Sequence, residues 1–193
     1  MLSHGPSHHA QAAATELAQL FWAWHEPSRD NLSTIGEALD VVARDSGQRP
    51  YILADMGDRV LAGALGDSTA IIESALVRAD RIRGAIPVTD PESVEAAAMA
   101  GIGAQVTLAI GGRFTPGLAP MTVSGVVIAI SDARFVVSGP FGTGEETSLG
   151  RTAALVVDDR LSILLTSKPG FTHGPAASQG IDVASQDPVM ISS

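Results

Sequence analysis

The chain has 193 residues, 45% of them hydrophobic and 4% aromatic, which predicts a domain with a buried core and excludes general disorder. Its formal net charge of −9 disfavours nucleic acid as a partner, and no apolar run approaches the roughly 20 residues of a membrane span. The sequence contains no cysteine for disulfides or thiolate metal sites and shows no signal-peptide pattern, so we expect a cytoplasmic protein without a membrane partner.

Two helices are predicted between residues 10 and 45. The apolar residues of the first, about residues 10–25, have helical spacing at Leu17, Leu20, Phe21 and Trp24. This spacing predicts one buried face. Trp22 points away from that face; packing by another part of the chain is the favoured interpretation, and a partner surface is the alternative. Thr34 and Glu37 have the spacing of a capping box and predict the start of the second helix.

Residues 51–110 are predicted to alternate strand, helix, strand, helix and strand. Short apolar runs indicate strands at 51–54, 85–88 and 105–110. Asp67 to Thr69 has the residue types of a helix-capping turn, and Asp90 followed by Pro91 is a typical helix start. This alternation predicts parallel pairing with right-handed crossovers.

Residues 111–193 are predicted to form antiparallel strands and an irregular tail. The expected strands are 121–130, 134–138, 152–157 and 161–166, and the tail at 168–186 is rich in Gly, Pro and Ser. Asp158–Asp159 lies between two apolar runs and predicts a hairpin. The expected fold is therefore α/β, with a mixed sheet that has a parallel βαβαβ first part and antiparallel strands after it, flanked by helices.

The segment from Asp55 to Thr69 is the candidate functional site. It connects a strand end to a helix N-terminus, which is where open α/β sheets bind ligands. Asp55, Asp58 and Asp67 could orient a substrate or hold a cation there. The alternative, which the chemistry alone favours, is that Asp67 caps its helix while the other two carboxylates accept hydrogen bonds from loop amides.

Other catalytic patterns are incomplete. A Walker-type phosphate loop is excluded because Asp67 stands where a lysine is required. His4 and His8 have metal-clamp spacing, but their place at the N-terminus favours a frayed, solvated segment. Glu145–Glu146 is best interpreted as a solvated turn. We therefore predict no catalytic residue and no metal ligand in this chain.

The order of motifs along about residues 10–190 is distinctive. A strand ending in Leu-Ala-Asp leads to a loop in which the characteristic positions are Asp58, Gly63, Ala64, Gly66, Asp67 and Thr69. The segments that follow are Asp90-Pro91-Glu92-x-Val94 with an Ala-rich helix, Ala100–Leu108, Gly111–Gly112, Gly139–Pro140, Leu149–Ala153 and Leu164–Ser167. This order resembles the C-terminal domain of the MlrC-like (microcystinase-type) metallopeptidase family, and we expect residues 1–193 to form a single such domain.

What the resemblance implies is a zinc-dependent hydrolase of amide bonds in peptide-like substrates. The family's zinc ligands belong to a larger N-terminal domain, and this chain has no equivalent segment, so zinc is implied for the full-length family and no cofactor for this chain. The chain alone is expected to be non-catalytic, and whether it counts as an enzyme stays open. It would close the cleft and assemble with a metal-binding N-terminal domain or subunit. The substrate-loop candidates are Asp55, Asp58, Gly63, Gly66, Asp67, Ser68 and Thr69.

Within this loop, Asp58 and Asp67 are expected to orient substrate groups, and Gly63 and Gly66 to permit close approach. The loop departs from the family pattern because bulkier residues replace its Asn, Pro and Gly at Arg59, Val60, Leu61, Ala62 and Leu65. Such side chains restrict how closely a ligand approaches the backbone. Two alternatives remain: an interaction subunit for a separately encoded metal-binding partner, and a small-ligand binding domain that uses the helix start at Gly66–Thr69. A homo-oligomer is also possible.

Overall fold

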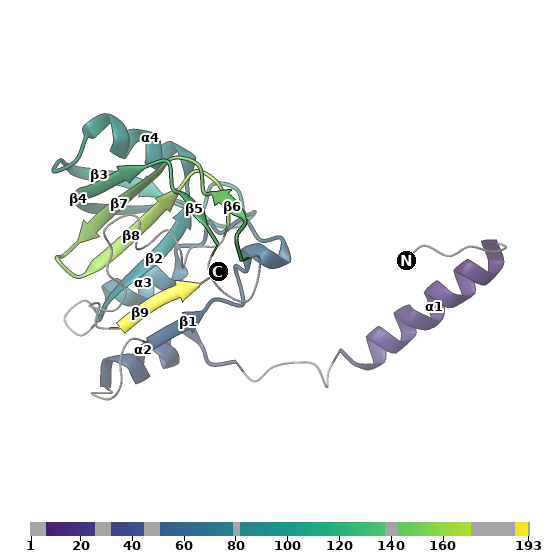
Figure 1. Ribbon diagram of the computed structural model, residues 1–193. Coiled ribbons are helices and arrows are strands. Elements are labelled where there is room, and N and C mark those ends of the chain that lie inside the picture. Colours follow the sequence, from purple (N-terminus) through teal and green to yellow (C-terminus); the bar gives the residue numbers. More distant parts are fainter. Residues whose placement is uncertain are drawn as a thin grey trace. The chain divides into compact units, whose positions relative to one another are not determined.

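The computed structural model describes residues 7–25, 32–44, 51–78, 82–137, 143–170 and 188–192. The chain divides into two compact units, residues 1–33 and residues 34–193, and each is described by itself. The first unit contains helix α1 (Ser7–Ala23), and all other helices and strands belong to the second (Figure 1). None of the described helices is long and apolar enough to cross a membrane.

Helix α1 corrects one prediction. Its apolar spacing is helical as predicted, but within its own unit the expected face is not buried: Leu20, Phe21 and Trp24 are 52%, 79% and 65% exposed. The reason is that α1 is the one element described in this unit, so no other described element of the unit packs against it. Trp22, 72% exposed, stacks on the ring of His25 with 4.5 Å between centroids.

The second unit is built on a mixed sheet, as predicted. Its five central strands, in spatial order, are β2 (Arg83–Thr89), β8 (Leu161–Thr166), β7 (Thr152–Val157), β4 (Met121–Ser131) and β3 (Gln105–Ile110). Strand β8 is parallel to β2, and the other neighbouring pairs are antiparallel. Strands β9 (Pro188–Ser192) and β1 (Tyr51–Ala54) extend the sheet beyond β2, both in parallel.

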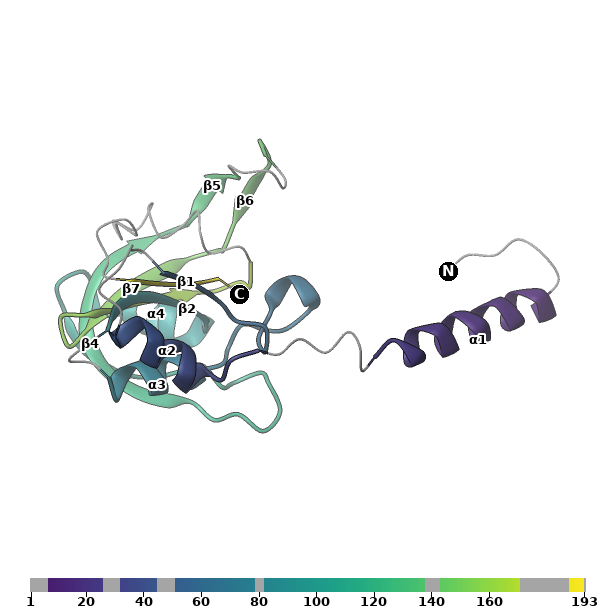
Figure 2. The ribbon, with the colours of Figure 1, turned by 90° about the horizontal axis from the view of Figure 1, so that it is seen from below.

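The strands of residues 51–110 do not pair with one another, in contrast to the predicted parallel pairing. Strand β9 separates β1 from β2, and the β8, β7 and β4 strands separate β2 from β3. These partners come from segments distant in sequence, which local patterning does not specify. The register of β4 against β7 shifts between Val127 and Ala129, and a bulge of this kind bends a strand. Figure 2 shows the sheet curling toward helices α2, α3 and α4 on one face.

The three helices of the second unit begin largely as the sequence predicts. Helix α2 (Ile35–Arg44) starts with the expected capping box: the Thr34 N–H donates to the Glu37 carboxylate at 2.8 Å, and the Glu37 N–H donates to the Thr34 hydroxyl at 3.3 Å. Helix α4 (Pro91–Ala100) follows Asp90, and helix α3 spans Ala70–Leu76. The core between helices and sheet includes the fully buried side chains of Leu39, Ile72, Val94, Leu155 and Ile163.

Two hairpins complete the described fold. The β7–β8 hairpin is confirmed, and its turn residues Asp158 and Asp159 have φ of 52° and 54°. Strand β5 (Arg134–Val136) pairs with β6 (Glu146–Ser148) in a separate antiparallel ribbon. The expected turn at Glu145–Glu146 is therefore wrong, because Glu146 begins β6 and pairs with Val136. Most of the tail predicted at 168–186, and His4, lie outside the described residues.

Candidate functional site

Asp55 and Asp58 organise the loop that follows β1. One carboxylate oxygen of Asp55 accepts hydrogen bonds from the N–H groups of Gly57 and Asp58, at 2.8 and 3.1 Å. Asp58 reaches across the loop and accepts from the N–H groups of Gly66 and Ser68, at 3.0 and 2.8 Å. Both carboxylates thus hold backbone amides, which is the alternative that the sequence chemistry favoured.

The middle of this loop is a short 3-10 helix, η1 (Val60–Ala62), which ends at Gly63 in a left-handed conformation with φ of 95°. Gly66 lies against the end of β2. A Cβ on Gly66 would come within 2.9 Å of the Thr89 hydroxyl, and the Gly66 carbonyl accepts from the Thr89 N–H at 2.7 Å. Gly66 therefore allows the loop to pack against β2, whereas Gly63 has open space where a side chain would stand.

Asp67 is fully buried and binds a second loop, residues 111–120, between β3 and β4. Its carboxylate accepts hydrogen bonds from the N–H groups of Phe114 and Thr115, at 2.7 and 3.1 Å, and from the Thr115 hydroxyl. The predicted capping role is therefore wrong: Thr69 is the residue before helix α3 and makes no side-chain cap, and the Asp67 carboxylate is engaged 47 residues away. Ser68 makes a long contact, 3.4 Å, with the Ala70 N–H.

The hydrogen bonds of Asp67 favour its ionised form. Burial is the largest single influence and raises the pKa of Asp67, but the Thr115 hydroxyl and the N–H groups of Phe114, Thr115 and Arg113 together lower it below its ordinary value. The carboxylate is thus an anion enclosed by donors of one loop. The main-chain carbonyl oxygen of Asp67 accepts a further hydrogen bond, from the Gly112 N–H at 2.7 Å.

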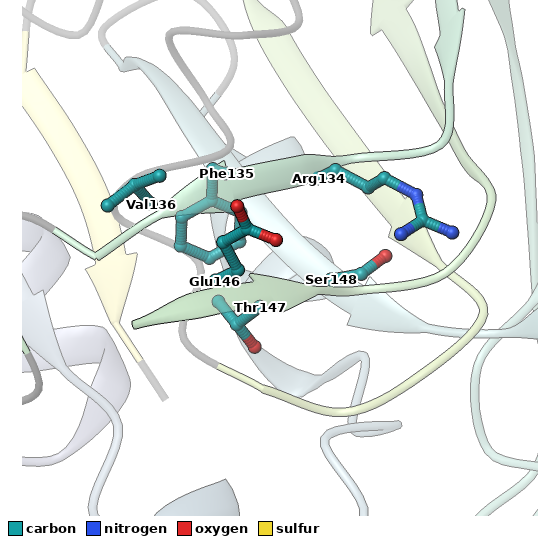
Figure 3. Close-up of a pocket in the computed structure, with 6 residues that line it drawn as sticks. All are labelled: Arg134, Phe135, Val136, Glu146, Thr147 and Ser148. Atoms are coloured by element: carbon teal, nitrogen blue, oxygen red, sulfur yellow. The ribbon is translucent and has the colours of Figure 1, made fainter. Parts of the chain in front are cut away.

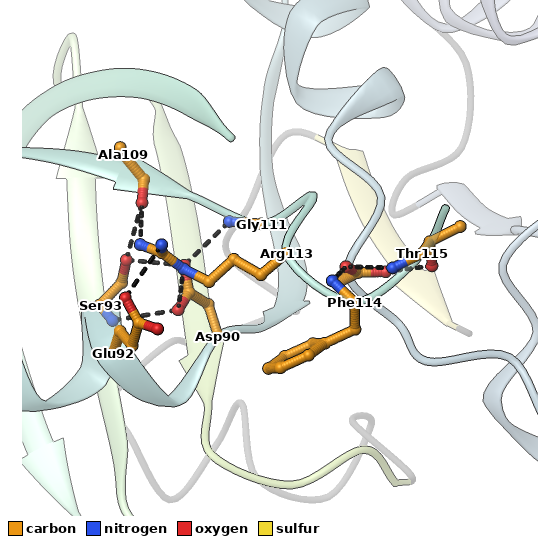
Figure 4. A network of polar contacts seen from close by, with 9 residues as sticks. Asp90, Glu92, Ser93, Ala109, Gly111, Arg113, Phe114 and Thr115 are labelled. Carbon is orange, nitrogen blue, oxygen red and sulfur yellow. Dashed lines mark hydrogen bonds and ion pairs between the residues drawn. The ribbon is translucent and has the colours of Figure 1, made fainter. Parts of the chain in front are cut away.

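Asp90 is a second buried carboxylate that binds the same loop (Figure 4). It caps α4 as predicted, through the N–H and hydroxyl of Ser93 at 3.1 and 2.7 Å. It also accepts from the Gly111 N–H and from Arg113 Nε, both at 2.9 Å. Arg113 extends to the Glu92 carboxylate at 3.0 Å and the Ala109 carbonyl at 2.6 Å.

The loop at 111–115 is the part of the site that the sequence did not reveal. No spacing rule links Asp67 to Phe114 or Asp90 to Arg113, since these pairs are 47 and 23 positions apart. The available signal was the pair Gly111–Gly112, two consecutive glycines directly after a predicted strand. Both have positive φ, and a Cβ on Gly111 would come within 2.6 Å of the Asp67 carbonyl oxygen. The two glycines let the loop approach Asp67 closely.

The residues of this site do not fit a zinc centre. Zinc takes four ligands in tetrahedral geometry. Asp55, Asp58 and Asp67 instead each accept hydrogen bonds from main-chain N–H groups. Across the described part of the chain, no three His, Asp or Glu side chains are grouped to hold a metal ion. The arrangement can fix the path of two loops, and no metal-dependent step is assigned to it.

A separate hollow of about 430 Å³ lies on the β5–β6 ribbon (Figure 3). It is lined by Arg134, Phe135, Val136, Glu146, Thr147 and Ser148. None of the candidate loop residues lines it, and its charged residues Arg134 and Glu146 are exposed. The hollow therefore adds nothing to the site at residues 55–69.

The fold and the two joined loops define a mixed α/β domain whose loops are fixed by buried carboxylates. Residues 53–193 match the family described as MlrC C-terminus, and the chain belongs to this family. A crystal structure of a protein from Mesorhizobium sp. BNC1, described as a "Putative metallopeptidase", is similar, with 30% sequence identity and a TM-score of 0.81. The similarity covers 91% of this chain and 35% of that chain, so this chain spans about a third of its length. A comparison with curated proteins found no match.

Proposed function

We propose that this chain is the C-terminal, non-catalytic part of an MlrC-type zinc hydrolase that cleaves amide bonds in peptide-like substrates. The observation that supports the proposal is the unequal coverage: 91% of this chain corresponds to only 35% of the Mesorhizobium protein. The zinc would be held by the remaining part of such a protein, either as an N-terminal domain or as a separate subunit. A cytoplasmic location is part of the proposal, on the grounds of composition.

The role of this domain is to present a wall of the substrate cleft. Its candidate residues remain Asp55, Asp58, Gly63, Gly66, Asp67, Ser68 and Thr69. The carboxylates act indirectly, because Asp58 and Asp67 already hold main-chain amides and fix the loops in one geometry. Loops that are ordered before binding lose less conformational entropy when a substrate arrives. Gly63, with open space beside it, is the point where a substrate can approach the backbone.

The first test measures zinc and hydrolysis on the full 193-residue chain. We expect substoichiometric zinc after dialysis, measured by mass spectrometry of the metal, and no cleavage of peptide amides. Tightly bound stoichiometric zinc together with peptidase activity would overturn the proposal. The Mesorhizobium protein serves as the control for the assay conditions.

The second test is a chimera in which this full chain replaces the matching region of the Mesorhizobium protein. We expect the chimera to retain the zinc content of the parent, since the metal-binding part is unchanged. We also expect it to hydrolyse those amide substrates that the parent cleaves. A parent from which the matching region is deleted is the control, and equal hydrolysis by the deleted parent and the chimera would contradict a role for this domain.

A further inference from the structure

Exposed apolar side chains are concentrated at the C-terminal end of helix α1 and in the turn directly after it. Leu20, Phe21, Trp22 and Trp24 are all more than half exposed, within five positions. The chain contains only two tryptophans, and both are here. Aromatic side chains, and tryptophan above all, are enriched in the few residues that dominate binding energy at protein interfaces.

Helix α1 also has no supporting element among those described in its own unit. A 17-residue helix in water is marginally stable unless another element covers its apolar face. Within the first unit no second described element provides that cover. Among the described residues, the buried core of the second unit is made of residues from Leu39 to Leu165.

The charge of α1 indicates what kind of surface would cover it. Glu16 is its one acidic residue, and it has no lysine or arginine, although the whole chain carries a net charge of −9. A helix without cations is poorly suited to an anionic membrane surface, which attracts basic residues. An uncharged, aromatic helix end suits a neutral apolar groove on a protein.

The structural similarity indicates which protein supplies that groove. The first unit comprises 33 of the 193 residues, which is more than the 9% of the chain left outside the match. At least part of the first unit therefore has a counterpart in the Mesorhizobium protein, where most of the chain lies beyond the matched region. Such a shared segment can contact the additional part of the longer protein, which makes that part the candidate partner.

We propose that Leu20, Phe21, Trp22 and Trp24 form the docking surface of this chain for the metal-binding part of an MlrC-type protein. This inference rests on the proposed function for the identity of the partner. The aromatic end of α1 inserts into an apolar groove on that part, and burial of the two tryptophans orders the helix. The loops at 55–69 and 111–120 remain available to the cleft.

The first measurement uses the unmodified chain, in which tryptophan fluorescence reports on α1 alone. We expect the emission of solvent-exposed indole, independent of protein concentration. Emission of buried indole at every concentration would mean that the second unit covers the helix, and a shift on dilution would mean that a second copy does. Either result overturns the proposal. A blue shift on neutral lipid vesicles would overturn it in favour of a membrane surface.

The second measurement is hydrogen exchange of residues 7–23 in the chimera described above. We expect exchange at least about tenfold slower than in the chain alone, because docking adds local stability. Replacing Phe21, Trp22 and Trp24 together by Ser is expected to restore fast exchange. The matched control, Met99→Ser with Ile102→Ser, changes two exposed apolar residues of the second unit and should leave the protection intact.

The outcomes separate the two proposals. A chimera that binds zinc and hydrolyses amides while α1 exchanges as fast as in the chain alone overturns the docking surface and leaves the proposed function standing. Protection of α1 in a chimera that does not hydrolyse amides supports the docking surface and overturns the proposed function. A chimera that fails to fold counts against the docking surface, since the groove is then incompatible with this helix.

Discussion

At the scale of single residues, the site depends on two buried carboxylates that both accept hydrogen bonds from main-chain groups of the loop at 111–115. Asp67 and Asp90 are both fully buried, and together they bind Gly111, Arg113, Phe114 and Thr115. Buried charges are costly unless they are fully hydrogen-bonded, and here each carboxylate has at least three donors. Asp67 therefore joins residues 55–69 to residues 111–115, and Asp90 joins the same loop to the start of α4.

Replacing Asp67 by Asn tests this arrangement. An amide cannot accept as a carboxylate does from three donors, so one buried N–H or hydroxyl loses its partner. We expect the variant to lose about 1–3 kcal/mol of unfolding free energy, measured by urea denaturation followed by circular dichroism. Phe114→Ala is the control, because its side chain is half exposed and its N–H still reaches Asp67. Equal losses in the two variants would show that side-chain packing, and not the carboxylate, holds the loop.

The same carboxylate makes stability depend on pH. Because the folded state lowers the pKa of Asp67 from its ordinary value of 3.8, the ionised form contributes stability above about that pH. The contribution is lost as the pH falls below 3.8 through the lowered folded value. Thermal melts across this window should therefore show the difference between the native chain and Asp67→Asn shrinking with acidification. A difference that stays constant through the window would contradict the assignment.

At the scale of elements, most starts and turns followed from local chemistry. The capping box of Thr34 and Glu37 and the Asp90–Pro91 helix start were predictable because a few neighbouring residues decide each of them. Strand β6 was missed because its three residues, Glu146–Ser148, carry no apolar run. Its pairing with β5 defines it, and this pairing is not encoded in the segment alone.

The β7–β8 turn offers a test at this scale. Asp158 and Asp159 both have positive φ, and the Arg160 N–H donates to the Val157 carbonyl at 3.1 Å, as in a type I′ turn. We expect Asp159→Val to lower the unfolding free energy by about 1–2 kcal/mol, since a β-branched L-residue is strained there. Asp159→Gly is the matched control and should be neutral or stabilising. Chemical denaturation of both variants measures the effect, and similar stability for Val and Gly would argue against this turn geometry.

At the scale of the whole molecule, the mixed α/β character was predictable and the strand order was not. Apolar runs at 105–110, 152–157 and 161–166 located three strands to the residue. Their neighbours, however, depend on segments such as β9, which inserts between β1 and β2 from more than 100 positions away. The candidate loop could be singled out for the same reason as the strands, since a strand end, a glycine-containing segment and a helix start are local features; its role as a site stays a prediction. Its partner loop at 111–115 could not be singled out, because the contact is tertiary.

The division into two units predicts that the second is thermodynamically independent. All residues of the main core cluster lie within residues 34–193. We therefore expect a shortened chain that begins at Thr34 to keep the melting temperature of the full chain, measured by circular dichroism in the strand region. The triple substitution of Phe21, Trp22 and Trp24 by Ser is a useful companion and should also leave it unchanged. A clear drop in either case would mean that α1 packs on the second unit.

The way in which loop 111–115 is held has an evolutionary consequence. Asp67 recognises the peptide N–H of Phe114 and not its ring, so the path of the loop is fixed while the side chain at that position is left open. Position 114 can then accept new residues without disturbing the scaffold beneath it. Relatives that share the two carboxylates should therefore be free to diverge at this position.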